Sequence, residues 1–221
     1  MKKVVIAIDG PAAAGKSTVS KAVAKTLGFT YIDTGAMYRA FTNYVIDKGV
    51  DPKNETECVK LIPEVDIILY PDGKVFCSGK DVTRIIREPL VSSNVSYIAS
   101  YKNIRLALVD LQRKMAGEQS VVMDGRDIGT YVLPNADVKI FMVASVKERA
   151  NRRYKENMEK GIQCSYEDIV EDIEKRDRID SSRAFAPLKP ADDSVKLDTS
   201  DLSIEGAIQA VLEIIKNKVG I

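Results

Sequence analysis

The feature that most constrains this chain is the stretch Gly-Pro-Ala-Ala-Ala-Gly-Lys-Ser-Thr at residues 10–18, which matches the pattern G-x-x-x-x-G-K-[ST]. It directly follows the apolar run Val4–Ile8. In a strand-loop-helix setting, consecutive backbone N–H groups and the positive end of the helix dipole point at one anion. The stretch therefore predicts a phosphate-binding loop and a nucleotide-linked function.

The residue types inside the loop fit this chemistry. Gly10 and Gly15 allow the tight backbone curl, Lys16 supplies a charge for the outer phosphates, and Ser17 offers a hydroxyl to Mg²⁺. A simple glycine-alanine turn with a chance Lys-Ser pair would not need the preceding strand and the following helix. The predicted contacts to the donor nucleotide in this loop are Gly10, Pro11, Ala12, Ala13, Ala14, Gly15, Lys16, Ser17 and Thr18.

Composition excludes several kinds of chemistry. The chain contains no histidine, so serine-histidine or cysteine-histidine nucleophiles, histidine-bound zinc and histidine-ligated haem are excluded. The 33 basic and 32 acidic residues nearly cancel, so no global field attracts nucleic acid or an acidic membrane. We expect small-molecule partners, with anions bound locally, and a monomer.

The three cysteines, Cys58, Cys77 and Cys164, are scattered and form no C-x-x-C pair. This spacing argues against a disulfide framework and against a zinc site. The N-terminal apolar run is broken at Asp9, and no long apolar segment follows. We expect a protein of the cytoplasm that neither uses a signal peptide nor spans a membrane.

Short apolar runs alternate with segments of helical period, which is typical of a parallel sheet covered by helices on both faces. The predicted class is α/β with five parallel strands. The strands expected are Val4–Ile8, Tyr31–Asp33, Val121–Asp124, Val138–Val143 and Val195–Asp198. The helices expected are Lys16–Leu27, Ala36–Lys48, Asn103–Met115, Lys147–Lys160 and Ile204–Val219.

Two insertions interrupt this alternation. The first, at about residues 56–88, contains a hairpin pattern with strands at Ile67–Tyr70 and Lys74–Cys77. The second, at about residues 146–187, is rich in arginine and includes Ser165, which fits a helix cap. Each arginine has the alternative of a solvated ion pair along a helix. As a group, they favour a helical flap that neutralises phosphate charge.

Polar clusters also follow two of the predicted strands, where ligands bind in open α/β sheets. Asp33-Thr-Gly-Ala-Met-Tyr-Arg39 follows the second strand, and Asp124-Gly-Arg-Asp127 follows the third. Helix capping or turn formation is the alternative for Asp33 and Asp124. We expect Asp124 to orient Mg²⁺ through water and the Ser17 hydroxyl to bind the ion.

Five segments together resemble the bacterial cytidylate kinase family over nearly the whole chain. They are GPAAAGKST at 10–18, DTGAMYR at 33–39, DGRD at 124–127, KIFMVAS at 139–145 and RDRIDSSRAFAPL at 176–188. The phosphate loop is shared by many nucleotide enzymes, whereas DGRD together with SSRAFAPL is far more specific. The resemblance implies transfer of the ATP γ-phosphoryl group to CMP or dCMP with Mg²⁺. It also implies one domain over 1–221, with a core at about 1–35, 103–145 and 187–221, a monophosphate-binding insert at about 36–102 and a lid at about 146–186.

Carried over position by position, the resemblance assigns most of the site. It places the acceptor phosphate on Arg39, Arg126 and Arg183, cytosine on Ser96, Arg105 and Asp127, and ribose on Arg176 and Asp180. Asp33 and Thr34 belong to the acceptor motif, Arg149 and Arg153 are candidates for the transferring phosphoryl group, and the predicted catalytic set is Lys16, Asp124, Arg126 and Arg183.

The chain departs from the family's pattern in two places. Ala13 replaces a common glycine and Thr34 a common serine. Neither change removes a donor that the reaction needs, although Thr34 adds a methyl group beside the acceptor.

Three other functions stay open at this stage. A phosphate-loop kinase for UMP or a small metabolite would share most of these residues. A regulatory GTPase would carry an N/T-K-x-D motif, which is absent here. A binding module without chemistry would not need arginines on the acceptor side.

Overall fold

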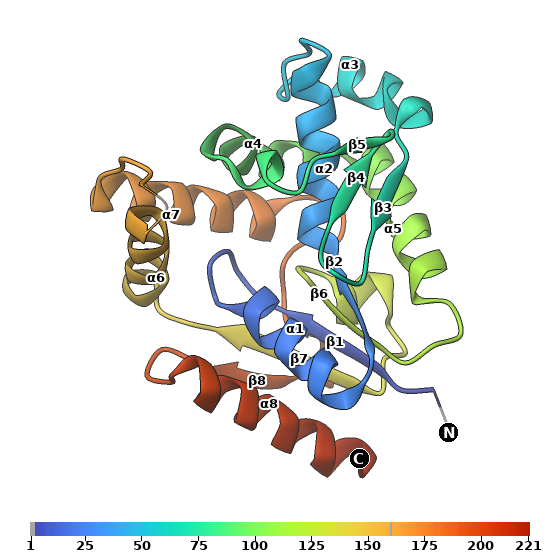
Figure 1. The fold of residues 1–221 in the computed structure, drawn as a ribbon, viewed down its shortest axis with the longest axis vertical. Helices are drawn as coiled ribbons and strands as arrows, with labels where there is room; N and C mark the ends of the chain where they lie inside the picture. The colour runs from blue at the N-terminus through green and yellow to red at the C-terminus, as the bar shows by residue number, and fades with distance from the viewer. Residues whose placement is uncertain (1–2, 160) are drawn as a thin grey trace. The chain divides into compact units, whose positions relative to one another are not determined.

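The computed structural model describes residues 3–159 and 161–221. Lys160, at which one predicted helix ends, and the first two residues of the predicted core lie outside the described residues. Backbone contacts divide the chain into two compact units, whose elements are labelled in Figure 1. The first unit holds the chain up to Tyr31 together with Glu118–Ile221, and the second unit holds Ile32–Gly117.

A five-stranded sheet with the strand order β2-β6-β1-β7-β8 organises the first unit (Figure 1). Strand β1 pairs in parallel with β6 and β7, and β7 pairs in parallel with β8. All five residues of β6 are buried, as is typical of a central parallel strand. The predicted parallel sheet is confirmed. Its strands are β1 (Val5–Asp9), β2 (Thr30–Asp33), β6 (Val121–Gly125), β7 (Val138–Val143) and β8 (Val195–Asp198).

Helices α1 (Lys16–Leu27) and α8 (Ile204–Val219) pack against each other and against this sheet. Ile6 and Ile8 of β1 alternate along the strand and share one apolar core with these two helices. A π-helical turn, η3 (Ile128–Val132), packs against β1 and β6. The α/β class with helices around the sheet is confirmed.

Helices α6 (Val146–Glu159) and α7 (Tyr166–Ser182) pack on each other in the segment predicted as the lid. Ala150, Ile169 and Ile173 form a small core of their own between the two helices. The predicted cap at Ser165 is confirmed, because its side chain accepts a hydrogen bond of 3.0 Å from the backbone N–H of Asp168.

The second unit combines helices with a small antiparallel sheet of order β3-β4-β5. The predicted hairpin is confirmed, with Ile68 opposite Phe76 and with Gly73 at a φ of 90° in the turn. The elements of this unit are α2 (Thr34–Asp47), α3 (Glu55–Lys60), η1 (Ile62–Glu64), β3 (Ile67–Leu69), β4 (Val75–Cys77), β5 (Lys80–Asp81), η2 (Ile85–Arg87), α4 (Pro89–Ser100) and α5 (Lys102–Ala116).

Phe41, Ile86 and Ile98 lie in one apolar core that α2, η2 and α4 share. Helix α5 groups with this unit by its contacts, whereas our predicted core included it. The division into core, insert and lid stays a prediction. Within residues 3–159 and 161–221, none of the helices is long and apolar enough to cross a membrane.

Candidate active site

The phosphate loop joins β1 to α1, and its backbone explains why small residues occupy it. A Cβ atom on Gly10 would collide with the carbonyl oxygen of Met142 on β7. Gly15 has a φ of 85°, and Ala13 has a φ of 58°. This left-handed conformation costs a residue with a Cβ atom about 1–2 kcal/mol, so a glycine would occupy position 13 with less strain. The loop retains its curl in spite of Ala13.

Lys16 is buried at the first turn of α1, and its Nζ donates a hydrogen bond of 2.7 Å to the carbonyl oxygen of Pro11. Burial lowers the pKa of Lys16 to about 7, and the positive charge of Arg126 acts in the same direction. Asp124, Asp9 and Asp180 oppose this shift. A polyphosphate at this position would favour the charged form of the amine.

Ser17 and Asp124, the two residues expected at Mg²⁺, are in contact: the Ser17 hydroxyl donates to Asp124 Oδ2 at 3.0 Å. The other oxygen, Asp124 Oδ1, accepts a hydrogen bond of 2.7 Å from the Tyr31 hydroxyl. Tyr31 was not predicted as a site residue. Oxygen donors of this kind fit Mg²⁺, which keeps several waters and takes few protein ligands.

Four charged side chains form a cluster beside the phosphate loop, in which Asp127, Asp180 and Arg183 are buried and Arg126 is half-buried. Arg126 Nε lies 2.9 Å from Asp180 Oδ2, and Arg183 Nη2 lies 3.4 Å from Asp127 Oδ1. Arg183 Nε also donates to the carbonyl oxygen of Ala186 at 2.7 Å. These ion pairs link the loop after β6 to the C-terminal end of α7.

The cluster is arranged to keep its charges. Burial opposes the charge on Asp180, yet Arg126, Arg183 and Arg176 together hold the pKa of this carboxyl below its usual value. Burial lowers the pKa of Arg176 to about 10, with a further contribution from Arg126. Once Arg176 is counted with these four residues, three arginines accompany the two carboxylates, so the cluster favours an anion.

The two predicted arginines of α6, Arg149 and Arg153, have different environments. Arg149 is buried and donates from Nη1 to the carbonyl oxygen of Ala12 at 3.0 Å and from Nη2 to Asp177. Arg153 lies 3.6 Å from Glu156 in an ion pair along the helix, which is the alternative considered for single arginines. Arg149 therefore touches the phosphate loop directly.

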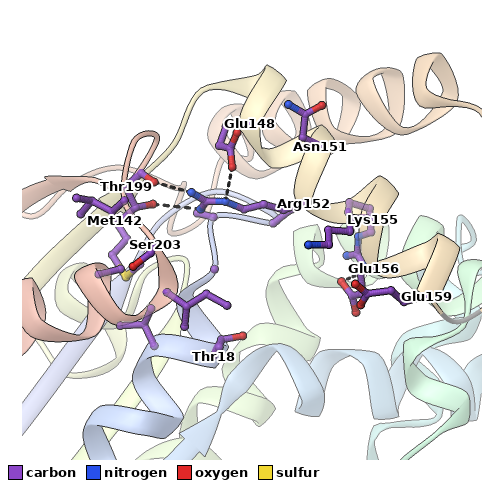
Figure 2. Close-up of a pocket in the computed structure, with 18 residues that line it drawn as sticks. Thr18, Met142, Glu148, Asn151, Arg152, Lys155, Glu156, Glu159, Thr199 and Ser203 are labelled. Carbon is purple, nitrogen blue, oxygen red and sulfur yellow. Dashed lines mark hydrogen bonds and ion pairs between the residues drawn. The ribbon is translucent and has the colours of Figure 1, made fainter.

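Arg152 of α6 was not predicted as a site residue. Its side chain extends from the helix to the loop after β8. Its guanidinium donates to the backbone and side-chain oxygens of Thr199, and its Nε donates to Glu148 at 2.9 Å (Figure 2). A Cβ atom on Gly15 would lie 3.6 Å from Arg152 Nη1. In the sequence, the one signal that could indicate Arg152 is the high density of arginines in this segment.

A cavity of about 690 Å³ lies beside the phosphate loop, within the first unit. Its wall includes Ala13, Gly15 and Thr18 of the loop and of α1, and Ser203 at the start of α8. Figure 2 shows Arg152, Glu156 and Glu159 along the α6 side of this cavity. A volume of this size is typical of a small-molecule site.

The second unit holds the other predicted acceptor residues. Asp33 caps α2, because its Oδ1 accepts a hydrogen bond of 2.7 Å from the N–H of Ala36. Its Oδ2 also lies 3.3 Å from Arg39 Nη2 and 3.8 Å from Arg87 Nη2. Asp33 therefore both caps a helix and holds two arginines. Arg87, at the end of η2, was not predicted.

Three further predicted residues of this unit are buried: Thr34 at the start of α2, Ser96 on α4 and Arg105 on α5. Arg105 donates to the carbonyl oxygen of Ala99 at 3.0 Å, and its guanidinium lies 5.4 Å from the ring centre of Tyr38. The first unit thus brings together Lys16, Ser17, Asp124, Arg126, Asp127, Arg149, Arg176, Asp180 and Arg183, and the second unit carries Asp33, Thr34, Arg39, Ser96 and Arg105.

Comparison with known proteins adds to this geometry. A family model described as cytidylate kinase matches residues 6–217. A cytidylate kinase of Bacillus licheniformis is 50% identical, with 98% of each chain covered, and one of Bacillus subtilis is 49% identical with the same coverage. A gluconokinase structure from Sinorhizobium meliloti has a TM-score of 0.52 at 12% identity, covering 98% of this chain and 94% of the other. That likeness concerns the fold alone.

Proposed function

The chain belongs to the cytidylate kinase family, and we infer that it transfers the γ-phosphoryl group of ATP to CMP or dCMP, giving ADP and CDP or dCDP. The observation that carries this function is the family match over residues 6–217, because it covers the phosphate loop and every predicted acceptor residue. The enzyme is a phosphotransferase. The roles of single residues below are our proposals.

We propose that the phosphate loop binds the ATP phosphates, with Lys16 at the outer ones. Arg149 and Arg153 are proposed to approach the transferring group, and the contact between Arg149 and the Ala12 carbonyl supports Arg149 more strongly. The adjoining cavity, with Arg152 on its wall, is proposed to hold the nucleoside part of ATP. Ser17 directly and Asp124 through water would hold Mg²⁺, which when bound neutralises charge between the outer phosphates.

We propose that Arg39, Arg126 and Arg183 hold the acceptor phosphate, because a guanidinium fork matches two phosphate oxygens. Arg176 and Asp180 are proposed to hold the ribose. Ser96, Arg105 and Asp127 are proposed to hold cytosine, with Asp33 and Thr34 lining the acceptor motif. The burial of all three cytosine residues supports this assignment, since a buried polar group discriminates strongly between bases.

The reaction proposed is a direct in-line transfer that needs no strong general base. A nucleoside monophosphate is largely dianionic at neutral pH, since its second pKa is near 6, so its oxygen is already a nucleophile. Lys16 and the arginines hold the two anions in line and stabilise charge that spreads over the transferring oxygens. Residues of α6 and α7 would exclude the water that otherwise hydrolyses ATP.

Two smaller proposals follow. We propose that the protein acts as a monomer on ATP, CMP and dCMP without a nucleic-acid or membrane partner, and the nearly balanced charge supports the absence of such a partner. The three cysteines are free, which fits the reducing cytoplasm.

The reading of cytosine by Asp127 gives a first prediction. A carboxylate accepts a hydrogen bond from the cytosine N4 amino group, whereas uracil presents an acceptor there. An asparagine offers both a donor and an acceptor. The Asp127→Asn variant is expected to lower kcat/KM for CMP on the order of tenfold or more and to narrow the preference over UMP, because a hydrogen bond to a charged group contributes about 1.5–3 kcal/mol.

The measurement is ADP release from ATP with CMP, dCMP, UMP and AMP offered separately to both proteins. The wild-type protein should respond to CMP and dCMP alone. Asp193→Asn, which changes an exposed carboxylate paired with Lys139, is the matched control and should behave as wild type. Wild-type activity on UMP or AMP would contradict the proposed acceptor, and an unchanged base preference in Asp127→Asn would contradict the role of Asp127.

A further inference from the structure

Asp9 is the last residue of β1 and directly precedes Gly10 of the phosphate loop. Its side chain is buried and accepts two backbone hydrogen bonds: Oδ1 from the N–H of Ile128 and Oδ2 from the N–H of Gly129, both at 2.7 Å. Each carboxylate oxygen therefore holds one amide. These short, charge-assisted bonds fix both the position and the orientation of the segment that they hold.

The two amides open the π-helical turn η3, directly after Asp127. The Asp127 carbonyl oxygen in turn accepts from the N–H of Tyr131 at 2.8 Å and from that of Val132 at 3.1 Å. The backbone of Asp127 is thus tied to η3, and Asp9 ties η3 to the end of β1. π-helical turns occur frequently at functional sites.

Close packing leaves this segment little freedom. A Cβ atom on Gly129 would lie 3.4 Å from Asp9 Oδ2 and 3.1 Å from the Cδ of Lys139. The distance to Asp9 Oδ2 is an ordinary contact, so the Lys139 side chain is what limits the space at position 129.

The Asp9 carboxylate is retained at an energetic cost. Burial raises the pKa of Asp9 to about 7, and the charge of Asp127 adds to this shift, whereas the two amides and Lys16 oppose it. The carboxylate of Asp9 presents one acceptor oxygen to each of the two amides. Its two acceptor oxygens are what an amide lacks.

We propose that Asp9 is a positioning residue of the acceptor site: through the amides of Ile128 and Gly129 it holds Arg126 and Asp127 in register with the phosphate loop. This role rests on the proposed function, because it concerns the residues that would bind the acceptor phosphate and cytosine. One side chain thereby couples the loop for the donor phosphates to the loop that reads the acceptor.

The test is the Asp9→Asn variant, in which one oxygen of the carboxylate becomes an NH₂ group that faces an N–H donor. The loop should then lose one hydrogen bond and move. We expect kcat/KM for CMP to fall by about 10- to 100-fold, as for the loss of supporting contacts in other sites. The preference for CMP over UMP should fall as well. The loss of the Asp9 charge beside Lys16 would lower the rates with CMP and with UMP by the same factor. A fall in the ratio of kcat/KM for CMP to that for UMP therefore reports the position of the loop that carries Asp127.

The matched control is Asp137→Asn, because Asp137 Oδ2 accepts a hydrogen bond of 2.8 Å from the N–H of Val5 at the other end of β1. This variant should keep the wild-type ratio. A folded Asp9→Asn protein with the wild-type ratio of CMP to UMP would overturn the proposal. If wild-type protein itself does not phosphorylate CMP, the proposed function fails instead, so the two failures are distinguishable.

A second variant covers the case in which Asp9→Asn does not fold. Gly129→Ala leaves the Asp9 charge in place and adds a methyl group 3.1 Å from the Cδ of Lys139, so that η3 should shift by a few tenths of an ångström against Asp9. The ratio of CMP to UMP should fall here too, while binding of ATP, measured by calorimetry, stays within about twofold of wild type, since the phosphate loop is unchanged. An unaltered ratio in Gly129→Ala would likewise overturn the proposal.

Discussion

Lys16→Ala is expected to lower kcat for CMP phosphorylation on the order of a thousandfold, because the variant loses the charge that stabilises the outer phosphates during transfer. The fold should survive. Asp9 accepts from two backbone amides, and Asp124 accepts from the Tyr31 and Ser17 hydroxyls. Neither buried carboxylate therefore depends on Lys16 alone. ADP release with saturating CMP gives the rate, and thermal unfolding reports the fold.

The control is Lys21→Ala, one turn further along α1, where the side chain is exposed. It should keep both the rate and the unfolding temperature of wild type. A turnover in Lys16→Ala within a few-fold of wild type would exclude the phosphate loop as the donor site.

Arg183→Ala should have the second largest effect, a loss in kcat/KM for CMP on the order of 10²- to 10³-fold. Arg183 is buried at the end of α7, where it contacts Asp127 and the Ala186 carbonyl. Its removal takes a positive charge from the proposed acceptor-phosphate site and also leaves Asp127 with less compensation. Initial rates over a range of CMP concentrations provide the measurement.

Arg178→Ala is the matched control for this variant. Arg178 lies on the same helix, and its exposed side chain pairs with Glu174 at 3.9 Å. Exposed pairs of this kind contribute little, so its kinetics should equal those of wild type. If Arg183→Ala and Arg178→Ala had the same kcat/KM, Arg183 would have no part in the acceptor site.

Much of the first unit was predictable because its signals are local. Short apolar runs defined the strands, and the phosphate-loop pattern defined the first turn of α1. Ser17 and Asp124 were each expected near Mg²⁺, the first from the phosphate-loop pattern and the second from its place at the end of a strand. Their 3.0 Å contact was not predicted.

The elements that the sequence did not predict have weak local signals. Helix α4 was missed because Ser92, Ser93 and Asn94 have low helix propensity, although Val91, Val95 and Ile98 form its buried face. η3 owes its start to a side chain more than a hundred residues away, at Asp9. A prediction from neighbouring residues in the sequence cannot include a contact over that separation.

In the candidate site, too, single residues could be predicted from the sequence, whereas their contacts could not. The resemblance supplied Arg126 and Arg183, but their pairing with Asp180 and Asp127 joins residues 54 and 56 positions apart. Tyr31, Arg87 and Arg152 were missed because a single polar residue on a strand, turn or helix carries no motif. Their roles depend on which carboxylate or carbonyl group lies within reach.

Phosphoryl transfer to CMP is measured most directly by following a label on the γ-phosphate of ATP while the protein is incubated with Mg²⁺ and CMP. We expect the label to leave ATP only as fast as it enters CDP. In Lys16→Ala, both the loss of label from ATP and its entry into CDP should stop. Label found in inorganic phosphate alone, or retained in ATP while CMP is present, would contradict the claim that this chain transfers a phosphoryl group to CMP.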